Sequence, residues 1–375
     1  MKFDPMRILA VSNFYDSHGG GLERVAAQLN REFVAAGCDV AWAASDSDGL
    51  PENPARLIGL RCVNPTEKLT GLPMPIPDPR SIAQLRKAIR NADAVVIHDA
   101  LYVTSILAMI FAKTEKKPTV MIQHIGVIPF ANSLLNFIMR LANLVVTRPM
   151  MDTADRLAFI SATVRDDLLG KPPRRRSMLV FNGVDQSVFN DRQRFTRGET
   201  RAQWGLPLNA TLAIFVGRFV EKKGLRVLRL LAKQRPDVQF ALFGQGPIDP
   251  REWGLANVHP LGQQPQERIA DLYRAADMLL LPSVGEGYPL VVQEAMACGL
   301  PVICGNDSAK ADPTASRWLS GVNIDLADPQ SSAARCSAAI DALVDLPIDT
   351  AAMARYAAKA YNWRQMASTL LNSLR

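Results

Sequence analysis

Short apolar runs alternate with amphipathic stretches along most of the chain. In the first half, five runs have the apolar character of buried strands: RILAVSN, CDVAWAAS, DAVVIHD, TVMIQHIG and RLAFIS. The stretch LERVAAQLNREFVAAG, between the first two, has apolar residues at helical spacing. Strands that alternate with helices in this way favour βαβ units and a parallel sheet.

The pattern changes after about Asp185. The passage QSVFNDRQRFTRGETRAQW is polar and Arg-rich, shows no sustained periodicity, and is predicted to contain a linker. A second alternating series follows, with strand-like runs TLAIFVGR, VQFALFGQGP, MLLLPS and LPVICGN and helical stretches LRVLRLLAKQ, QERIADLYRAA and LVVQEAMAC. We therefore predict an α/β protein of two doubly wound, Rossmann-like parallel-sheet domains that face one another across a cleft.

The length of the chain fits this division, because 375 residues with 48% hydrophobic content can fill two cores. The first domain is predicted to span residues 1–185, and the linker residues 186–200. The second domain is predicted to span residues 201–355, and a closing helix at residues 356–375 is predicted to cross back to the first domain.

The charge of the chain favours an anionic partner. The formal net charge is +7, and the sequence pI is about 9.3. Both halves of the chain share the excess of basic residues. There are 22 basic and 18 acidic residues up to Asp185, and 21 basic and 18 acidic residues after it, so neither half is a dedicated basic domain. This charge favours a phosphate compound, an acidic membrane surface or nucleic acid as partner. Of these three we expect no nucleic acid.

Cysteine usage and the N-terminus indicate the compartment. The five cysteines are odd in number, scattered and without a CxxC pair, which argues against a disulfide framework or a zinc site. The first residues enter a strand-like run without the pattern of a signal peptide. We expect a cytoplasmic protein.

Residues 118–139 raise the question of a membrane. They contain no Asp, Glu, Lys or Arg, but Gln123, His124, Gly126 and Pro129 interrupt them, and we expect no transmembrane helix.

The following stretch suggests contact with the surface of an anionic membrane instead. Its apolar residues at helical spacing are Leu134, Ile138, Leu141 and Val145, and the nearby cations are Arg140, Arg148, Lys116, Lys117 and Arg174–Arg176. The alternative is that this helix packs in the core.

Residues just after the strands are the candidates for ligand binding, because open parallel sheets bind ligands beyond the carboxyl ends of their strands. After RILAVSN, the glycines Gly19, Gly20 and Gly21 lead into a helix whose free amides can face phosphate. The alternative is an ordinary βα loop. After TLAIFVG, Arg218 and Lys223 can converge on one diphosphate, and the alternative is a solvated charged loop.

Histidines follow two strands of the first half. His124 follows TVMIQ and is a candidate hydrogen-bond donor or base, or else a structural histidine. His98, after AVVI, is a weaker candidate, and Ser161, after LAFI, fits the N-cap of the helix ATVRDDLL.

The stretch GEGYPLVVQEAMACGLPVI, residues 285–303, contains two acids in an otherwise apolar setting. Pro289, Gly299 and Pro301 predict a helix from about 289 to 298, which leaves Glu286 in the loop before it and Glu294 about 7 Å along its axis. The amides of Tyr288, Leu290 and Val291 are free to hold an anion between these acids. A nucleotide sugar has this layout, because its diphosphate is flanked by two hydroxyl-bearing rings.

These motifs together resemble the retaining glycosyltransferases of the GT-B fold, of the large family 4 type that includes many mannosyl- and glucosyltransferases of bacterial surface polysaccharides. Residues 285–303 are similar to the E-x7-E signature of that family. The other similar segments, in chain order, are GGGLERVAAQL, VFNGVDQSVF, VGRFVEKKG, FGQGP, LYRAADMLLLPS and YNWRQMASTLL.

The resemblance implies a role for each candidate residue. Arg218 and Lys223 would bind the donor diphosphate, Glu294 the ribose, and Glu286 the transferred sugar. The remaining donor-side and cleft residues implied are Gly20, Gly21, His124, Gly287, Tyr288, Leu290 and Val291.

The resemblance also implies the reaction. A hexose would pass from a UDP-, GDP- or ADP-sugar to a glycan or lipid-linked glycan with retention, by a front-face route without a metal or other cofactor. GDP-mannose is a common donor among such proteins. The setting would be synthesis of a surface polysaccharide or glycolipid at the inner face of the cytoplasmic membrane.

Other functions remain open. An NAD-dependent dehydrogenase needs a GxGxxG sequence after a strand, and GGGLER lacks that spacing. A nucleotide-sugar epimerase or phosphorylase of the same fold would form product without a separate acceptor, and a sugar-binding protein would show no activity.

Overall fold

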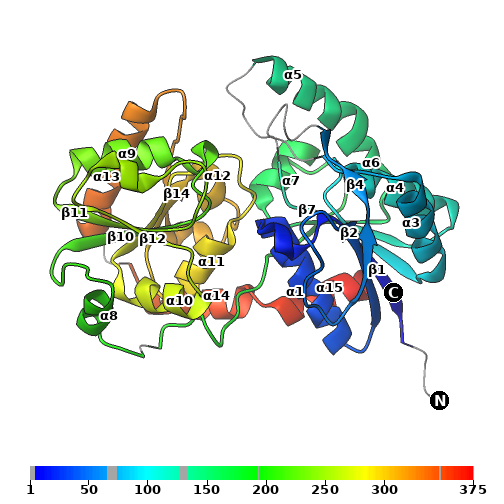
Figure 1. The fold of residues 1–375 in the computed structure, drawn as a ribbon, viewed down its shortest axis with the longest axis horizontal. Coiled ribbons are helices and arrows are strands. Elements are labelled where there is room, and N and C mark those ends of the chain that lie inside the picture. Colours follow the sequence, from blue (N-terminus) through cyan, green and yellow to red (C-terminus); the bar gives the residue numbers. More distant parts are fainter. Residues whose placement is uncertain (1–4, 66–73, 127–132, 193, 346–347, 375) are drawn as a thin grey trace. The chain divides into compact units, whose positions relative to one another are not determined.

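The computed structural model describes residues 5–65, 74–126, 133–192, 194–345 and 348–374 (Figure 1). The chain divides into two compact units. Among the described residues, the first unit holds those up to 126, 133–182 and 363–374, and the second holds 183–345 and 348–362.

The first unit is built on a seven-stranded parallel sheet of order β3-β2-β1-β6-β7-β8-β9. Its strands are β1 (Arg7–Phe14), β2 (Asp39–Ser45), β3 (Arg56–Leu60), β6 (Ala94–His98), β7 (Thr119–Gln123), β8 (Arg156–Phe159) and β9 (Met178–Leu179). Strands β6 and β7 are buried along their whole length, which explains their unbroken apolar runs. A short antiparallel pair, β4 (Cys62–Val63) and β5 (Ile76–Pro77), stands apart from this sheet.

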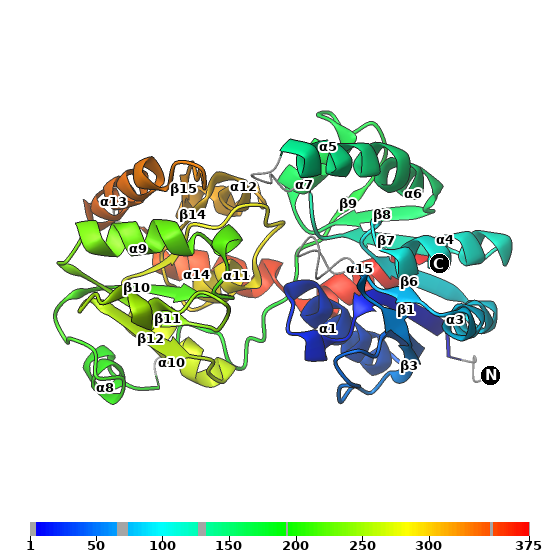
Figure 2. The same cartoon turned by 45° about the horizontal axis from the view of Figure 1, so that its top comes forward.

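Helices cover both faces of the first sheet (Figure 2). The helices of this unit are α1 (Gly21–Ala35), α3 (Pro79–Asn91), α4 (Val103–Thr114), α5 (Ser133–Ala142), α6 (Arg148–Thr153), α7 (Ala162–Leu169) and α15 (Trp363–Leu374). One turn of π-helix, Asn143–Thr147, joins α5 to α6. As predicted from the sequence, Ser161 caps α7, and its hydroxyl accepts a hydrogen bond from the amide of Val164.

The second unit has a six-stranded parallel sheet of order β12-β11-β10-β13-β14-β15. Its strands are β10 (Thr211–Val216), β11 (Val238–Phe243), β12 (Val258–Gly262), β13 (Met278–Leu281), β14 (Val302–Gly305) and β15 (Leu319–Val322). Its helices are α8 (Arg197–Gln203), α9 (Leu225–Gln234), α10 (Gln266–Ala275), α11 (Leu290–Ala297), α12 (Asn306–Ala309), α13 (Pro329–Asp345) and α14 (Thr350–Ala360). Helices α9 and α13 pack on one face, and α10, α11 and α14 on the other (Figure 2). The predicted fold class of two doubly wound parallel sheets is confirmed.

Part of the passage predicted to contain the linker is helical. Helix α8 begins within the expected linker, because Thr196 and Glu199 form a reciprocal capping box. The Thr196 hydroxyl accepts from the Glu199 amide, and the Glu199 carboxylate accepts from the Thr196 amide. The T-x-x-E spacing was present in the sequence, but the absence of an apolar period hid the helix.

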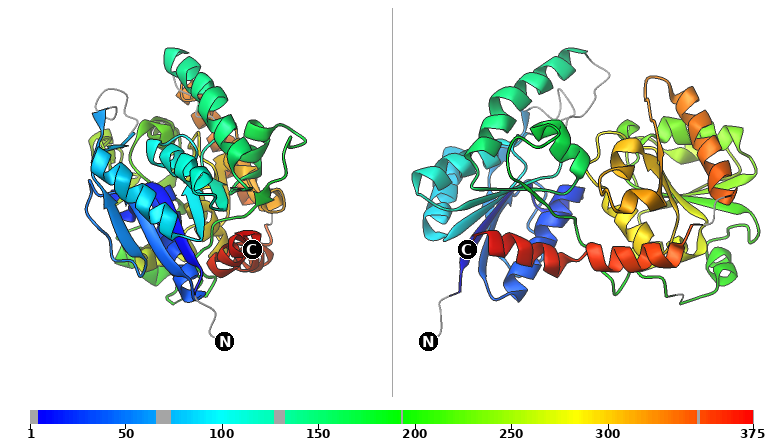
Figure 3. Two further views of the ribbon diagram at one scale, coloured as in Figure 1. Left: turned by 90° about the vertical axis from the view of Figure 1, so that its right-hand side faces the viewer. Right: turned by 180° about the vertical axis from the view of Figure 1, so that it is seen from behind.

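The chain returns to the first unit near its end. Helix α14 belongs to the second unit, and α15 packs on α1, β7 and β8 of the first (Figure 3). The change of unit comes directly after Tyr361 and Asn362, rather than at residue 356. In the described part of the chain, no helix is long and apolar enough to cross a membrane.

Candidate active site

The candidate residues of the second unit follow two neighbouring strands. Strand β10 lies between β11 and β13, so the strand order reverses at β10 and β13. Arg218 and Lys223 follow β10, and Glu286 follows β13. Ligands of open α/β sheets bind at such a reversal, beyond the carboxyl ends of the strands.

Gly224 allows the loops after β10 and β13 to pack closely. Its φ is +78°, and an added Cβ would lie 2.1 Å from the carbonyl oxygen of Pro282, so a side chain there would force the loops apart. The amide of Val284 also donates to the carbonyl of Lys222 at 3.0 Å. These contacts hold the turn that carries Lys223 against the loop that carries Glu286.

Lys223 and Glu286 form an ion pair. The Nζ of Lys223 lies 3.0 Å from Oε1 of Glu286, and the two side chains are 15% and 16% exposed. Burial raises the pKa of Glu286, but the charges of Lys223 and Lys222 outweigh burial and leave that pKa below its usual value. Glu286 is therefore ionised at neutral pH, and it engages the cation that the sequence assigns to the diphosphate.

The loop after β11 fixes the backbone that leads to Arg218. An added Cβ at Gly244 would lie 1.8 Å from the carbonyl oxygen of Gly217, and the amide of Phe219 donates to the carbonyl of Gln245 at 2.9 Å. The FGQGP segment thus supports the loop after β10 through its own backbone. The Arg218 side chain is exposed above it.

Helix α11 starts directly after the Glu286 loop. Pro289 is its N-cap, and the first backbone hydrogen bond runs from Val292 to Pro289 at 3.1 Å, so the amides of Leu290 and Val291 precede the intrahelical ladder. The observed bounds, Leu290–Ala297, agree with the helix predicted at about 289–298. Glu294 lies in this helix and is buried.

In the first unit, His124 is buried against a second histidine. Nε2 of His124 lies 3.0 Å from Nδ1 of His98, and both rings are almost fully buried. Burial lowers the pKa of His98 to about 3, and burial together with His98 lowers the pKa of His124 well below 6.5. Both imidazoles are therefore neutral at pH 7, and one ring nitrogen of the pair donates its proton to the other.

Asp99 shapes the backbone on which His124 stands. Its φ is +58°, and its Oδ1 accepts from the amides of His124 at 2.8 Å and Ile125 at 3.3 Å. Burial raises the pKa of Asp99 to about 7, although these two hydrogen bonds act to lower it. Asp99 was not among the residues predicted from the sequence, and His98 was predicted only as a weaker candidate than His124. The one sign of the histidine pair in the sequence was that a histidine stands at the carboxyl end of each of two successive buried strands.

The glycines at the start of α1 adjoin an acid of their own helix. Gly20 is the N-cap of α1, and an added Cβ there would lie 2.0 Å from Oε2 of Glu23, which is buried. Gly21 has open space around its missing Cβ. The role of Gly20 and Gly21 towards phosphate stays a prediction, and an anion near Gly20 would face the carboxylate of Glu23.

A cavity of about 60 Å³ adjoins Glu286. Its lining residues are Ser283, Val284, Gly285, Glu286, Gly305, Asn306, Asp307, Ser308, Asn323 and Ile324. The hydroxyl of Ser283 is buried and has no hydrogen-bond partner among the described residues. A polar group of a ligand bound at Glu286 could form a hydrogen bond with this hydroxyl.

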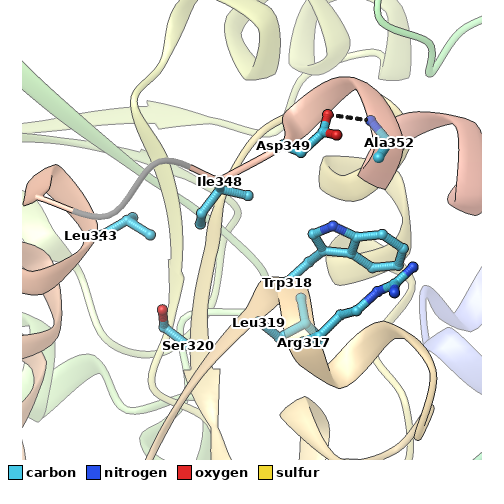
Figure 4. Close-up of a pocket in the computed structure, with 8 residues that line it drawn as sticks. All are labelled: Arg317, Trp318, Leu319, Ser320, Leu343, Ile348, Asp349 and Ala352. Carbon is cyan, nitrogen blue, oxygen red and sulfur yellow. Dashed lines mark hydrogen bonds between the residues drawn. The ribbon is translucent and has the colours of Figure 1, made fainter.

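A larger cavity, of about 610 Å³, lies at the amino end of β15, away from the strand ends that carry the candidate residues (Figure 4). Its lining residues are Arg317, Trp318, Leu319, Ser320, Leu343, Ile348, Asp349 and Ala352. Two of its charged groups have structural roles: Arg317 stacks on the Trp318 ring, and Asp349 caps α14 by accepting from the Ala352 amide at 2.8 Å. Its size therefore does not make it the active site.

Metal ligands are not assembled in the part of the chain that the structure describes, where no group of three or more His, Cys, Asp or Glu residues could hold an ion. The sequence contains one Asp-x-Asp triplet, Asp46-Ser47-Asp48, in the loop after β2. Asp48 of this triplet pairs with His18, whose Nδ1 lies 3.0 Å from its Oδ2. Metal independence stays a prediction.

Comparison with known proteins connects both units to one class. Residues 19–188 match the model of Glycosyltransferase Family 4, and residues 196–360 match that of Glycosyl transferases group 1. Together with the two parallel sheets, these matches define a GT-B glycosyltransferase fold. The chain belongs to the family 4 type of these glycosyltransferases, as its motifs predicted.

Curated relatives match over part of their length. D-inositol 3-phosphate glycosyltransferase of Thermobispora bispora is 32% identical over 244 residues, which are 59% of this chain and 56% of the relative. The putative teichuronic acid biosynthesis glycosyltransferase TuaC of Bacillus subtilis is 38% identical over 123 residues, 32% of this chain and 31% of TuaC. The matched region thus spans only about a third to a little over half of these relatives.

Solved structures resemble the chain over nearly its whole length. Sucrose-phosphate synthase from Thermosynechococcus elongatus has a TM-score of 0.73 at 20% identity, with 98% of each chain covered. HepE from Anabaena, solved in complex with UDP-glucose, has a TM-score of 0.70 at 17% identity, with 98% of this chain and 99% of HepE covered. At these identities the likeness establishes the fold.

Proposed function

We propose that this protein transfers a hexose from a nucleotide-diphosphate sugar to an acceptor hydroxyl, with retention of the anomeric configuration. The observation that carries the proposal is the ion pair of Lys223 and Glu286 beside the first amides of α11. A cation and free amides suit a diphosphate, and an adjacent carboxylate suits the hydroxyls of the attached sugar.

Each residue has a proposed task. Arg218 and Lys223 bind the diphosphate with the amides of Leu290 and Val291, and Glu294 accepts from the ribose hydroxyls. Glu286 accepts from the hydroxyls of the transferred sugar. Gly287 and Tyr288 form the loop between Glu286 and these amides, while His124, Gly20 and Gly21 take part in the same reaction from the first unit.

The proposed chemistry needs no nucleophilic side chain. The bond between the anomeric carbon and the β-phosphate oxygen breaks, and the acceptor oxygen bonds to that carbon on the same face. The acceptor proton passes to the departing diphosphate oxygen. Arg218, Lys223 and the amides stabilise the negative charge that develops there, which is the main catalytic effect and requires no metal.

The substrates are proposed from the relatives and from the motifs. The name of TuaC places that protein in teichuronic acid biosynthesis, and HepE binds UDP-glucose. We propose a UDP-, GDP- or ADP-hexose donor, with GDP-mannose among the candidates, and a glycan or lipid-linked glycan acceptor of a surface polysaccharide or glycolipid. The sugar transfer would take place in the cytoplasm, at the inner face of the cytoplasmic membrane.

An exposed apolar stripe supports membrane contact. It consists of Phe137, Ile138, Leu141, Leu144 and Val145, which are 48% to 64% exposed on α5 and the π-helical turn that follows. Arg140 and Arg148 flank the stripe, are exposed, and form no ion pair within the described residues. The side chain of Leu134 lies outside the described residues. Apolar side chains bordered by cations suit the headgroup region of an anionic bilayer, and we propose that surface as the partner.

A ligand screen followed by a rate measurement tests the function. UDP, GDP and ADP and their sugars are compared by thermal shift, because a ligand of the native state raises its stability by mass action. Sugar transfer is then measured with the donor that binds, with and without glycan acceptors. Product formed without acceptor would favour an epimerase or phosphorylase, and binding without turnover for any acceptor would favour a sugar-binding protein.

Vesicle sedimentation tests the membrane contact. At low salt we expect the protein to pellet with vesicles that contain anionic lipid, and less so with zwitterionic vesicles. The variant with Phe137→Ser and Leu141→Ser should stay in solution. The control Leu208→Ser removes a 56% exposed apolar side chain from the second unit and should pellet like the wild type. Equal sedimentation of all three proteins would contradict the proposal.

A further inference from the structure

Three tyrosines form a hydrogen-bonded cluster around the buried carboxyl group of Asp312. One of them, Tyr288, belongs to the loop that carries Glu286. The hydroxyls of Tyr361 and Tyr356 lie 2.9 Å and 2.7 Å from Oδ2 of Asp312. The hydroxyl of Tyr288 lies 2.7 Å from that of Tyr361. Tyr288, Tyr361 and Asp312 are almost completely shielded from solvent, and Tyr356 closes the cluster at its edge.

The chemistry of the carboxylate sets the direction of these hydrogen bonds. Oδ1 of Asp312 accepts from the amides of Thr314 and Ala315, and Oδ2 is likewise an acceptor for the two hydroxyls. Tyr356 and Tyr361 therefore donate to Oδ2. Since Tyr361 has one hydroxyl proton and gives it to Asp312, its oxygen accepts the proton of Tyr288.

The phenols keep their protons over the whole physiological range. Burial raises the pKa of Tyr288 well above its usual value, and burial followed by the nearby Tyr288 and Asp312 raises that of Tyr361. The chain of hydrogen bonds from Tyr288 through Tyr361 to Asp312 is therefore fixed in one direction. Such a satisfied buried network makes a rigid anchor.

Tyr288 connects this anchor to the proposed donor site. It stands between Glu286 and Pro289, the N-cap of α11, in the segment that we call the donor loop, residues 285–289. Fixing the phenol of Tyr288 fixes the backbone on both sides of it. The position of Glu286 against Lys223, and that of the amides of Leu290 and Val291, then depend on the partner of Tyr288.

That partner lies where the chain changes from one unit to the other. Tyr361 follows α14 and comes just before Trp363, the first residue of the return to the first unit. Its carbonyl accepts the amide of Val184 at 3.1 Å, and Val184 lies just beyond Asn182, the other point at which the chain changes unit. Tyr361 thus joins both crossing segments to the donor loop.

We propose that Tyr361 is a positioning residue for the donor loop and acts on the proposed reaction through the hydroxyl of Tyr288. This inference rests on the proposed function. Tyr361 is not among the residues proposed to bind the donor, so removal of its hydroxyl should alter the geometry of the loop and leave the chemical groups of the site in place.

The test compares three single substitutions and one double. Tyr361→Phe removes the hydroxyl that accepts from Tyr288 at 2.7 Å and leaves the Sδ of Met296, at 3.7 Å, as a weaker acceptor. Tyr288→Phe removes the donor. Tyr356→Phe removes a bond to Asp312 that does not involve the donor loop. We expect Tyr361→Phe and Tyr288→Phe each to lower kcat about tenfold and to weaken binding of the bare nucleoside diphosphate severalfold. The double variant should be no worse than either alone, because both substitutions break the same contact. Tyr356→Phe should change kcat and affinity less than twofold.

Thermal unfolding of the same variants distinguishes positioning from stability. All three hydroxyls are bonded and contribute to stability, so each single variant should lower Tm. A purely structural role would make Tyr361→Phe and Tyr356→Phe alike in kcat and affinity at a temperature well below both Tm values. That result, or additive losses in the double variant, would overturn the proposal.

A measurement without ligand separates this inference from the proposed function. Hydrogen exchange of the peptide spanning residues 285–292 should be faster in Tyr361→Phe than in Tyr356→Phe or the wild type. A wild type that binds none of the nucleotides would reject the proposed function. Equal exchange in Tyr361→Phe and Tyr356→Phe would reject the positioning role, whatever the protein binds.

Discussion

Replacing Glu286 by Gln should strengthen binding of the bare nucleotide while it lowers turnover. In the ligand-free protein the ammonium of Lys223 is engaged by Glu286 at 3.0 Å. A diphosphate that uses the same ammonium has to compete with this carboxylate, and it also meets the negative charge of Glu286. Gln has nearly the shape of Glu but no charge, so it removes both obstacles without leaving a void.

The geometry sets the size of the effect. At 3.0 Å and an effective dielectric constant of about 20, the gross attraction of the pair is about 5.5 kcal/mol. Most of it is offset by the desolvation of two side chains that are only about one-sixth exposed. A net gain of about 1 kcal/mol, or roughly fivefold tighter binding of the bare nucleotide, is the expected result. Loss of a charged acceptor for the transferred sugar should lower kcat roughly ten- to a hundredfold.

Calorimetry with the bare nucleotide and initial rates with the intact donor measure the two effects. The control Glu267→Gln removes an exposed negative charge from α10 of the same unit and reports the influence of net charge alone. The affinity gain of Glu286→Gln should exceed that of the control and shrink as salt is added. Weaker or unchanged binding of the bare nucleotide by Glu286→Gln would refute the competition between Glu286 and the diphosphate for Lys223.

Three further predictions concern the acids, the metal and pH. Glu294→Ala should weaken binding of the bare nucleotide and of the intact donor by a similar amount, about 1.5 to 3 kcal/mol, because both ligands contain the ribose. The same calorimetric experiment measures both affinities. Activity should survive excess chelator; loss that magnesium or manganese restores would show that the site needs a cation. The pKa values of His98, about 3, and of His124 lie below their unfolded values, so the free energy of unfolding should fall as pH drops below 6.5. His98 alone should contribute about 1.4 kcal/mol per pH unit. Asp99, with its pKa raised to about 7, contributes a slope of opposite sign between about pH 4 and 7. His98→Gln should therefore reduce the dependence of the unfolding free energy on pH below 6.5, as measured by urea unfolding.

Elements that carry their own signal were predictable. The inner strands are buried on both faces, so they appear in the sequence as unbroken apolar runs. Helix α11 could be delimited because Pro289 and Pro301 restrict the backbone at each end and Gly299 adopts a φ of +72°. These constraints act within a few residues, and a single sequence displays them.

Pairings between distant segments were not predictable. Lys223 and Glu286 meet because β10 and β13 are neighbours, and nothing in either strand specifies that order. His98 and His124 meet because β6 and β7 pair in a register that brings both strand ends together. A residue that looks weak in isolation, as His98 did, acquires a role only from its neighbour across the sheet.

The charges of the second unit explain how two acids can border an anion site. Arg218, Lys222 and Lys223 carry one more charge than Glu286 and Glu294, and the exposed Glu221 of the same turn offsets that excess before any ligand binds. The amino end of α11 adds the equivalent of about half a charge. The negative charge of a diphosphate would exceed the positive charge of this site if both acids faced the phosphates. Glu286 is paired with Lys223 and Glu294 is buried within α11, whereas Arg218 is exposed. Under the proposed function, the two acids would therefore face the hydroxyl-bearing rings on either side, and Arg218 and Lys223 would face the phosphates.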